Sequence, residues 1–190
     1  MRRVTRPAVL IAVAALGLAG CAGGGGEEGI PPALLATVPG DRALAVDARV
    51  ERVVDGDTFV ARVGDDRLRV RLLGIDTPES VRPDAPVECF GPEAAGRTAQ
   101  LLPQGAEVTL ETDPGGDRRD DFGRLLAYVT PGGGGATVNE TLLREGYADL
   151  FVYRREDPFA RVRTFRAARN AARAAGRGLW GACPRGERSR

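Results

Sequence analysis

The stretch VDARVERVVDGDTFVARVGDDRLRVRLLGI, residues 46–75, has the clearest structural pattern in the chain. It contains three runs rich in β-forming residues, at 46–54, 58–63 and 68–75. Asp-Gly-Asp at 55–57 and Gly-Asp-Asp at 64–66 separate these runs, and such sequences favour tight turns. The stretch therefore predicts three consecutive antiparallel strands, a β-meander.

The third run alternates strictly between apolar residues and arginines. The apolar residues are Leu68, Val70 and Leu72, and the arginines are Arg67, Arg69 and Arg71. Successive side chains of a strand point to opposite faces, so the pattern predicts one buried face and one face with three guanidinium groups.

Further elements follow along the chain. A helix is expected over 92–102, with Pro92 in its first turn. Strands are expected over 107–112 and 125–130. We expect a short helix capped by Asn139 and ended by Gly146, and a last helix from about 159 to Gly176. Five strands with three helices in this order predict an α+β fold, mainly a five-stranded barrel of the OB type.

The composition excludes several kinds of chemistry. The chain has 190 residues, no histidine and 27 basic residues, all of them arginine. Nucleophiles activated by imidazole and zinc sites with histidine ligands are therefore ruled out, and the cysteines at 21, 89 and 183 are too few for a four-thiolate zinc site. Carboxylates, arginines and oxygen ligands for hard cations remain. The formal net charge of +1 indicates no overall basic field, although arginines far outnumber acidic residues in 154–190. That segment is either a solvated helix face or a region that steers an anionic substrate.

The N-terminus has the features of an export signal. Residues 1–20 combine early arginines with a short apolar stretch and end in Leu-Ala-Gly before Cys21, which resembles the lipobox of bacterial lipoproteins. We expect Cys21 to be lipidated and the protein to be exported and anchored to the outer face of the cell membrane. An ordinary cleaved signal with a chance cysteine is the alternative. Residues 21–41, rich in glycine and proline, read as a flexible tether.

One domain is expected over 42–184, followed by a disordered tail at 185–190, and we expect a monomer. Cys89 lies just before the first predicted helix and Cys183 just after the last. In an exported domain these two cysteines are expected to form a disulfide, with two buried free thiols as the alternative.

Three segments concentrate charged side chains at predicted strand ends: 55–58 (DGDT), 71–79 (RLLGIDTPE) and 121–124 (DFGR). Each alone has an ordinary explanation as a turn or a loop end. Together and in this order, they resemble the staphylococcal nuclease (thermonuclease) family. Further matches are FGPEA at 90–94, VNE at 138–140, Gly146, and Leu-Trp at 179–180.

The resemblance implies an OB-barrel nuclease that uses Ca²⁺ to hydrolyse DNA and RNA to 3′-phosphate ends. The implied metal ligands are the carboxylates of Asp57 and Asp76 and the carbonyl of Thr77. Glu79 would be the general base, and Arg71 and Arg124 would grip the scissile phosphate. Tyr153 is retained in the region where the substrate base stacks, whereas Phe122 and Phe151 stand where the type member of the family has tyrosines.

The residue types suit these roles on physical grounds. A phosphodiester anion repels a nucleophile, so its charge must be neutralised and a water must be deprotonated beside it. Guanidinium groups match two phosphate oxygens at once, and carboxylate and carbonyl oxygens suit Ca²⁺. The alternative role for Arg71 and Arg124 is an ion pair with the acidic cluster. Asp55 is either a turn residue or a support for a ligand.

Two other functions are compatible with parts of the sequence. One is an OB-fold lipoprotein that binds nucleic acid without cutting it. The other is a structural envelope lipoprotein, which explains the tether but not the charged cluster.

Overall fold

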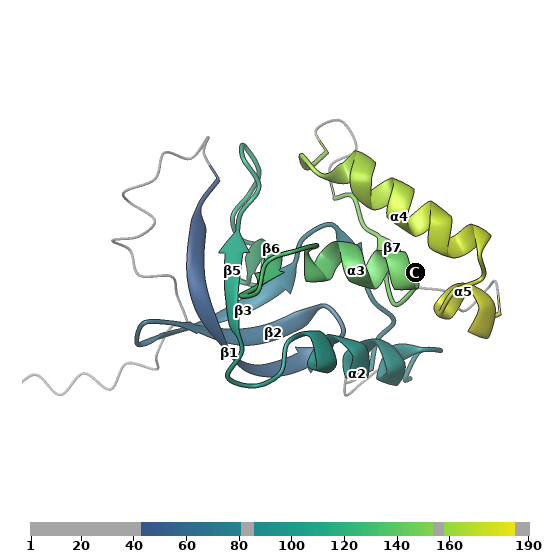
Figure 1. The fold of residues 1–190 in the computed structure, drawn as a ribbon, viewed down its shortest axis with the longest axis horizontal. Coiled ribbons are helices and arrows are strands. Elements are labelled where there is room, and N and C mark those ends of the chain that lie inside the picture. The colour runs from purple at the N-terminus through teal and green to yellow at the C-terminus, as the bar shows by residue number, and fades with distance from the viewer. Residues whose placement is uncertain (1–42, 81–85, 154–157, 185–190) are drawn as a thin grey trace, which may run out of the picture.

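A computed structural model describes residues 43–80, 86–153 and 158–184. Figure 1 shows a β-barrel with the helices gathered on one side of it. The predicted signal peptide, Cys21, the tether and the C-terminal tail lie outside the described residues. No helix within the described ranges is long and apolar enough to cross a lipid bilayer.

Five strands close the barrel in the order β1, β2, β3, β6, β5. Their bounds are Ala45–Asp55 for β1, Thr58–Val63 for β2, Asp66–Leu72 for β3, Glu107–Glu111 for β5 and Leu125–Pro131 for β6. The pair β3–β6 is parallel and the other pairs are antiparallel. The five-stranded OB-type barrel is confirmed.

Alternation along β2 and β3 builds the barrel interior. Phe59 pairs with Val70 and Ala61 with Leu68, and all four side chains belong to the buried core. Because partners in register lie on the same face, these apolar residues form layers inside the barrel, and the arginines of β3 are left on its outer face.

The third predicted strand ends earlier than expected. It stops at Leu72, and after a turn at 73–74 the residues Ile75–Asp76 form β4, which pairs with β7 (Asp149–Leu150). Gly74 adopts a φ of 79°, and a Cβ there would lie 2.5 Å from the ring of Phe159. The turn thus requires glycine, and it carries Asp76 off the barrel surface.

The helices are α2 (Gly91–Leu101), α3 (Val138–Glu145), α4 (Val162–Ala174) and the short α5 (Leu179–Ala182), which was not expected. Pro92 lies in the first turn of α2 as predicted. The prediction that Asn139 caps α3 was wrong, because the Thr137 side chain accepts the capping hydrogen bond from the Glu140 N–H.

Asn139 instead fills a buried hydrogen-bonding position. Its Oδ1 accepts from the Val129 N–H at 3.0 Å, and its Nδ2 donates to the carbonyls of Leu73 at 2.9 Å and Ala127 at 3.1 Å. The side chain is fully buried, so its amide replaces water for three backbone groups. Asn139 thereby ties α3 to β6 and to the segment that leads into β4.

Candidate active site

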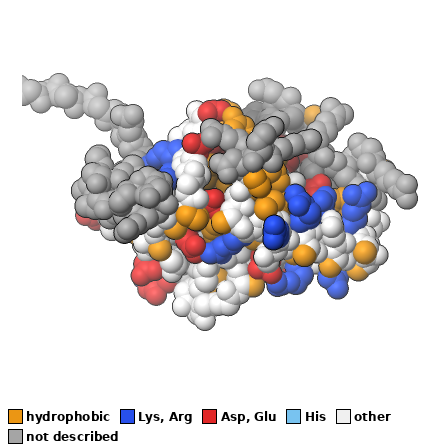
Figure 2. All heavy atoms as spheres, turned by 90° about the horizontal axis from the view of Figure 1, so that it is seen from above, with side chains coloured by type: hydrophobic (Ala, Val, Ile, Leu, Met, Phe, Trp, Pro, Cys, Tyr) orange, Lys and Arg blue, Asp and Glu red, His pale blue; other side chains and the backbone are white. Residues whose placement is uncertain are grey.

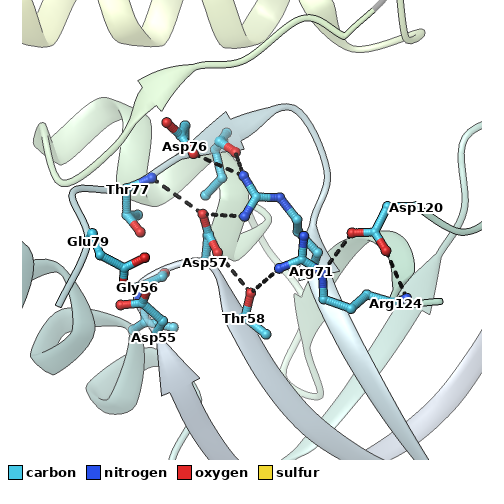
Figure 3. Close-up of polar contacts among 12 residues, drawn as sticks. Asp55, Gly56, Asp57, Thr58, Arg71, Asp76, Thr77, Glu79, Asp120 and Arg124 are labelled. Carbon is cyan, nitrogen blue, oxygen red and sulfur yellow. Dashed lines mark hydrogen bonds and ion pairs between the residues drawn. The ribbon is translucent and has the colours of Figure 1, made fainter. Parts of the chain in front are cut away.

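The charged segments predicted from the sequence meet at one end of the barrel. The turn between β1 and β2 brings Asp57, the end of β3 brings Arg71, and β4 brings Asp76 (Figure 3). Arg124 approaches from the start of β6. Asp57 and Arg124, which are 67 positions apart along the chain, therefore share one site.

Gly56 holds the β1–β2 turn against the Asp76–Glu79 segment. A Cβ at this position would lie 2.5 Å from Oγ1 of Thr77. The buried hydroxyl of Thr98 on α2 donates to the Gly56 carbonyl at 2.5 Å. Only glycine permits so close an approach, and the contact places Asp57 beside Thr77.

Arg71 joins the two predicted metal carboxylates. Its Nη1 lies 2.8 Å from Asp57 Oδ2, and its Nη2 lies 3.0 Å from Asp76 Oδ1. The Arg71 side chain is 17% exposed and that of Asp57 is 6% exposed, so water screens this bridge only weakly. The ion pair considered as an alternative role for Arg71 is therefore present in this structure.

Burial and crowding shift the pKa values of the site. Burial raises the pKa of Asp76, and the Asp57 carboxylate raises it further. Burial also raises the pKa of Asp55, and the negative charges of Asp57 and Glu79 raise it further. For Arg71, burial lowers the pKa, but the Asp57 and Asp76 carboxylates outweigh it and the net shift is upward. The pKa values of Asp55 and Asp76 thus stay raised although Arg71 is close by, and this favours an additional positive charge beside these carboxylates.

Arg124 is oriented by Asp120, a residue that the sequence interpretation missed. Asp120 Oδ2 accepts from Arg124 Nε at 2.6 Å, and Asp120 Oδ1 accepts from the N–H groups of Phe122 at 3.0 Å and Arg124 at 2.9 Å. Arg124 Nη1 also donates to Thr58 Oγ1 at 3.3 Å, next to Asp57. An aspartate that accepts from the N–H two residues on is typical of an Asx turn, and this was the available sequence signal.

Glu79 lies on the other side of the acidic cluster, near Asp55 (Figure 3). Its backbone is held by Glu88, which the sequence interpretation also missed. The Glu79 N–H donates to Glu88 Oε2 at 3.0 Å, and the Glu79 carbonyl accepts from the Glu88 N–H at 2.9 Å. A Cβ on Gly91 would lie 2.4 Å from the Glu79 carbonyl oxygen, so the start of α2 packs directly on this backbone.

The next residue after Glu88 is anchored covalently. Cys89 forms a disulfide with Cys183, which follows α5, and their Cα atoms are 5.9 Å apart. The disulfide belongs to a small apolar cluster with Ala172, Leu179 and Trp180. The segment that positions Glu79 is therefore fastened to the C-terminal helices.

This anchoring predicts a large effect of removing the disulfide. Replacing both Cys89 and Cys183 with serine should lower the free energy of unfolding by about 2–5 kcal/mol, because the unfolded chain is no longer constrained. The amide of Glu79 should also exchange faster with solvent. Urea denaturation and hydrogen exchange measure these effects, with the oxidised parent as control. An unchanged midpoint would contradict the structural role.

The oxygen atoms around Asp57 suit a hard cation. The Thr77 hydroxyl is buried and, within the described ranges, has no hydrogen-bond partner. It lies beside Asp57, whose Oδ2 is 3.5 Å from the Thr77 N–H. No group of three or more acidic or cysteine side chains among the described residues is arranged to hold a metal. The predicted set has only two carboxylates, and a carbonyl completes it, so the residues present fit a weak Ca²⁺ site.

A pocket of about 460 Å³ adjoins the two arginines and is lined by Arg71, Arg124, Phe122, Phe151 and Tyr153 among others, but not by Glu79. The guanidinium carbon of Arg71 lies 6.0 Å from the centre of the Phe151 ring, and that of Arg124 lies 5.3 Å from the centre of the Phe122 ring. Tyr153 is 72% exposed. The pocket thus presents two cations and three accessible aromatic rings, a combination that accepts a phosphate attached to a flat ring.

The model of the staphylococcal nuclease homologue family matches residues 69–182. The chain belongs to this family. The match covers the second half of β3, the acidic segment 76–79, the Arg124 loop and all the helices of the described residues, but Asp57 lies before it. The geometry, rather than the family match, places Asp57 in the site.

Several bacterial nucleases are similar to this chain. It is 45% identical over 109 residues to the SPbeta prophage-derived endonuclease YokF of Bacillus subtilis (strain 168), a match over 57% of this chain and 36% of that protein. It is 42% identical over 109 residues to the endonuclease YncB of the same strain, over 57% and 50% of the two chains. It is 40% identical over 106 residues to the thermonuclease of Staphylococcus hyicus, over 56% and 60%. The match thus spans roughly a third to three fifths of these relatives.

Proposed function

We propose that this protein is a Ca²⁺-dependent nuclease that hydrolyses DNA and RNA to 3′-phosphate ends. The observation that carries the proposal is the meeting of Arg71, Arg124, Asp57, Asp76 and Glu79 at one end of the barrel. Membership of the nuclease family and the similarity to endonucleases and thermonucleases support it. A module that only binds single strands has no need of a buried acidic cluster beside the two arginines.

In this proposal, Arg71 and Arg124 neutralise the scissile phosphodiester. Arg71 lies on β3 and Arg124 in the loop directly before β6, so each can hold a different pair of phosphate oxygens. To bind phosphate, Arg71 has to release part of its hold on Asp57 or Asp76. The rings of Phe122 and Phe151 lie against the guanidinium groups on the pocket side and limit their movement.

Glu79 takes the proton of the attacking water. Its backbone is held on both sides by Glu88, so the carboxylate projects from a fixed point toward the acidic cluster. Attack on phosphorus then breaks the bond to the 5′ oxygen, which takes a proton from solvent water and leaves as a hydroxyl group, while the phosphate stays on the 3′ oxygen. The charge of Glu79 is felt at Asp55, so the carboxylate of the proposed base lies at the edge of the acidic cluster.

Asp57, Asp76 and the Thr77 carbonyl would hold Ca²⁺, with the free Thr77 hydroxyl beside them. Bound there, the ion would supply positive charge to the phosphate and to the attacking water. Two carboxylates and a carbonyl leave room for water and phosphate oxygens, and such a site is weak, which suits the high calcium concentration outside cells.

Calcium removal tests this function directly. The purified protein should cleave denatured DNA and RNA at millimolar Ca²⁺, and excess EDTA should reduce the rate at least about 100-fold, because charge neutralisation by the ion is lost. Restoring Ca²⁺ should restore cleavage. Binding of single strands without cleavage at any calcium concentration would instead favour the OB-fold binding lipoprotein.

Export and lipid anchoring at Cys21 belong to the same proposal and rest on residues 1–21 alone. In a producing bacterium, the Cys21→Ser variant should shift from the membrane fraction to the soluble or secreted fraction, because the acylated thiol is lost. The parent chain expressed in parallel is the control. An unchanged distribution of the variant would argue against acylation of Cys21.

A further inference from the structure

The outer face of β3 carries two arginines that the proposed catalytic site does not use. Arg67, Arg69 and Arg71 alternate with the core residues of the strand, so all three point outward from the barrel. Arg71 enters the catalytic cluster. Alternate residues of a strand are about 7 Å apart, so Arg69 lies one step from Arg71 on the same surface.

The strand register places a second arginine in line with Arg69. Arg69 pairs with Val60 of β2, and Val60 pairs with Arg52 of β1. Partners in register share a face, so Arg52, Val60 and Arg69 form one row on the outer side of the sheet. Val60 is buried, and the exposed members of the row are the two arginines on either side of it. The neighbouring row contains Thr58 and Arg71, which face the catalytic cluster. We call the row of Arg52, Val60 and Arg69 the arginine row.

The charges of the arginine row are available to a ligand. Arg52 and Arg69 are exposed, and within the described residues neither side chain forms an ion pair or a hydrogen bond. The next row away from the site differs, because its arginines are paired with acids: Arg62 and Arg67 with Glu51, and Arg49 with Glu107. Among the described residues, positive charge without an ion-pair partner therefore lies next to Arg71, in the arginine row. In the row beyond it, Glu51 and Glu107 neutralise the arginines.

We propose that Arg52 and Arg69 bind backbone phosphates of a single-stranded polynucleotide next to the phosphate that is cut. The inference rests on the proposed function and extends it by a second substrate-binding site on the barrel face. Charge complementarity and direct continuity with Arg71 support this occupant. The spacing between rows suits successive phosphates of an extended strand, and the β2–β3 face of OB folds is suited to oligonucleotides.

A second basic surface on the molecule provides a matched control. Residues 158–184 contain six arginines and no acidic residue. Figure 2 shows basic side chains gathered over α4. Arg163 and Arg166 on α4 are exposed, but they lie on a helix and not on the strands that lead to Arg71. Removing them takes away the same charge without touching the arginine row.

The test compares the double variants Arg52→Gln/Arg69→Gln and Arg163→Gln/Arg166→Gln, each combined with Glu79→Gln in the complete protein to prevent cleavage. Binding of a labelled 12-nucleotide oligothymidylate and of thymidine 5′-monophosphate, which has one phosphate, is measured over a salt series. The arginine-row variant should weaken 12-mer binding about 5- to 10-fold and reduce the slope of log K against log salt by about 1.4, or 0.7 per lost phosphate contact. Binding of thymidine 5′-monophosphate should change less than about twofold, because its single phosphate is held at Arg71 and Arg124 and does not reach the row.

Each other outcome would overturn the inference. Equal weakening by the α4 variant would show a nonspecific charge effect. Normal 12-mer binding with lost binding to phosphatidylglycerol vesicles would assign the row to a membrane, and a loss only for duplex DNA would exclude the single strand.

The Arg52→Lys/Arg69→Lys variant should keep most of the affinity for the 12-mer, since a phosphate contact needs only the charge.

The test also separates this inference from the proposed nuclease. If the parent protein does not cleave DNA but the arginine-row variant still weakens 12-mer binding, the nuclease proposal fails and the arginine row stands. If the parent cleaves with Ca²⁺ and the arginine-row variant binds the 12-mer like the parent, the arginine row fails and the nuclease proposal stands.

Discussion

Replacing Glu79 with glutamine is expected to reduce kcat on denatured DNA by about 10²–10⁴, the range typical of a lost general base. Glutamine keeps the size of the side chain but cannot accept a proton from water. The backbone bonds from Glu88 to Glu79 do not involve the Glu79 carboxylate and should persist. The dissociation constant for oligonucleotides should therefore change little. Steady-state kinetics and binding at saturating Ca²⁺ measure the two quantities separately.

Glu93→Gln is the matched control for this substitution. Glu93 lies in the first turn of α2 and is exposed, so the variant removes the same charge without altering the cluster. Its kcat should remain within about twofold of the parent value, as for a surface substitution. Equal activity of the Glu79→Gln variant and the parent would remove Glu79 from the mechanism.

Replacing Arg71 with lysine should reduce kcat by about 10³-fold or more, an effect comparable to the loss of an arginine that stabilises a phosphoryl transition state. The guanidinium reaches Asp57 and Asp76 with two nitrogens at once. A lysine ammonium is a single point charge and cannot reproduce this planar arrangement on carboxylates or on phosphate. The variant keeps the positive charge, so the loss of kcat would show that the planar geometry of the guanidinium group is required.

Arg163→Lys on α4 is the control for Arg71→Lys. Arg163 is exposed and belongs neither to the proposed catalytic site nor to the arginine row. Its kcat should change less than about twofold. Because Arg71 is largely buried, the thermal midpoints of both variants must be measured. An Arg71→Lys variant that is folded and fully active would show that the planar guanidinium group is not needed.

Phe122 and Phe151, which stand in place of tyrosines, remove two hydroxyl groups from the pocket but keep its aromatic rings. Phe122 lacks the hydroxyl of the family's tyrosine, but its ring is 79% exposed and lies against Arg124. Phe151 similarly lies against Arg71. Both rings remain available for stacking, whereas the hydrogen bonds that tyrosines could make to phosphate are lost. Lower affinity for a terminal phosphate remains a prediction.

Much of the barrel could be predicted because its signals are local. The strands β1, β2, β5 and β6 begin and end close to the predicted bounds, since alternation of apolar residues and Asp-Gly turns act over a few positions. The two-residue strands β4 and β7 were not predicted, because two residues show no periodicity. The role of Asn139 was also misjudged, because the partners of its amide are on segments far away in the chain.

The sequence by itself determined which chemistry is available: with no histidine or lysine, phosphate and cation chemistry has to rely on arginines, carboxylates and carbonyl oxygens. It also determined the alternation that leaves Arg69 and Arg71 outside the core. Only the tertiary structure decided that Arg71 bridges Asp57 and Asp76, that Asp120 orients Arg124, and that Glu88 holds Glu79. Ion pairs and hydrogen bonds depend on distance and direction at the scale of an ångström, and the closure of the barrel sets these for residues that are remote in the chain.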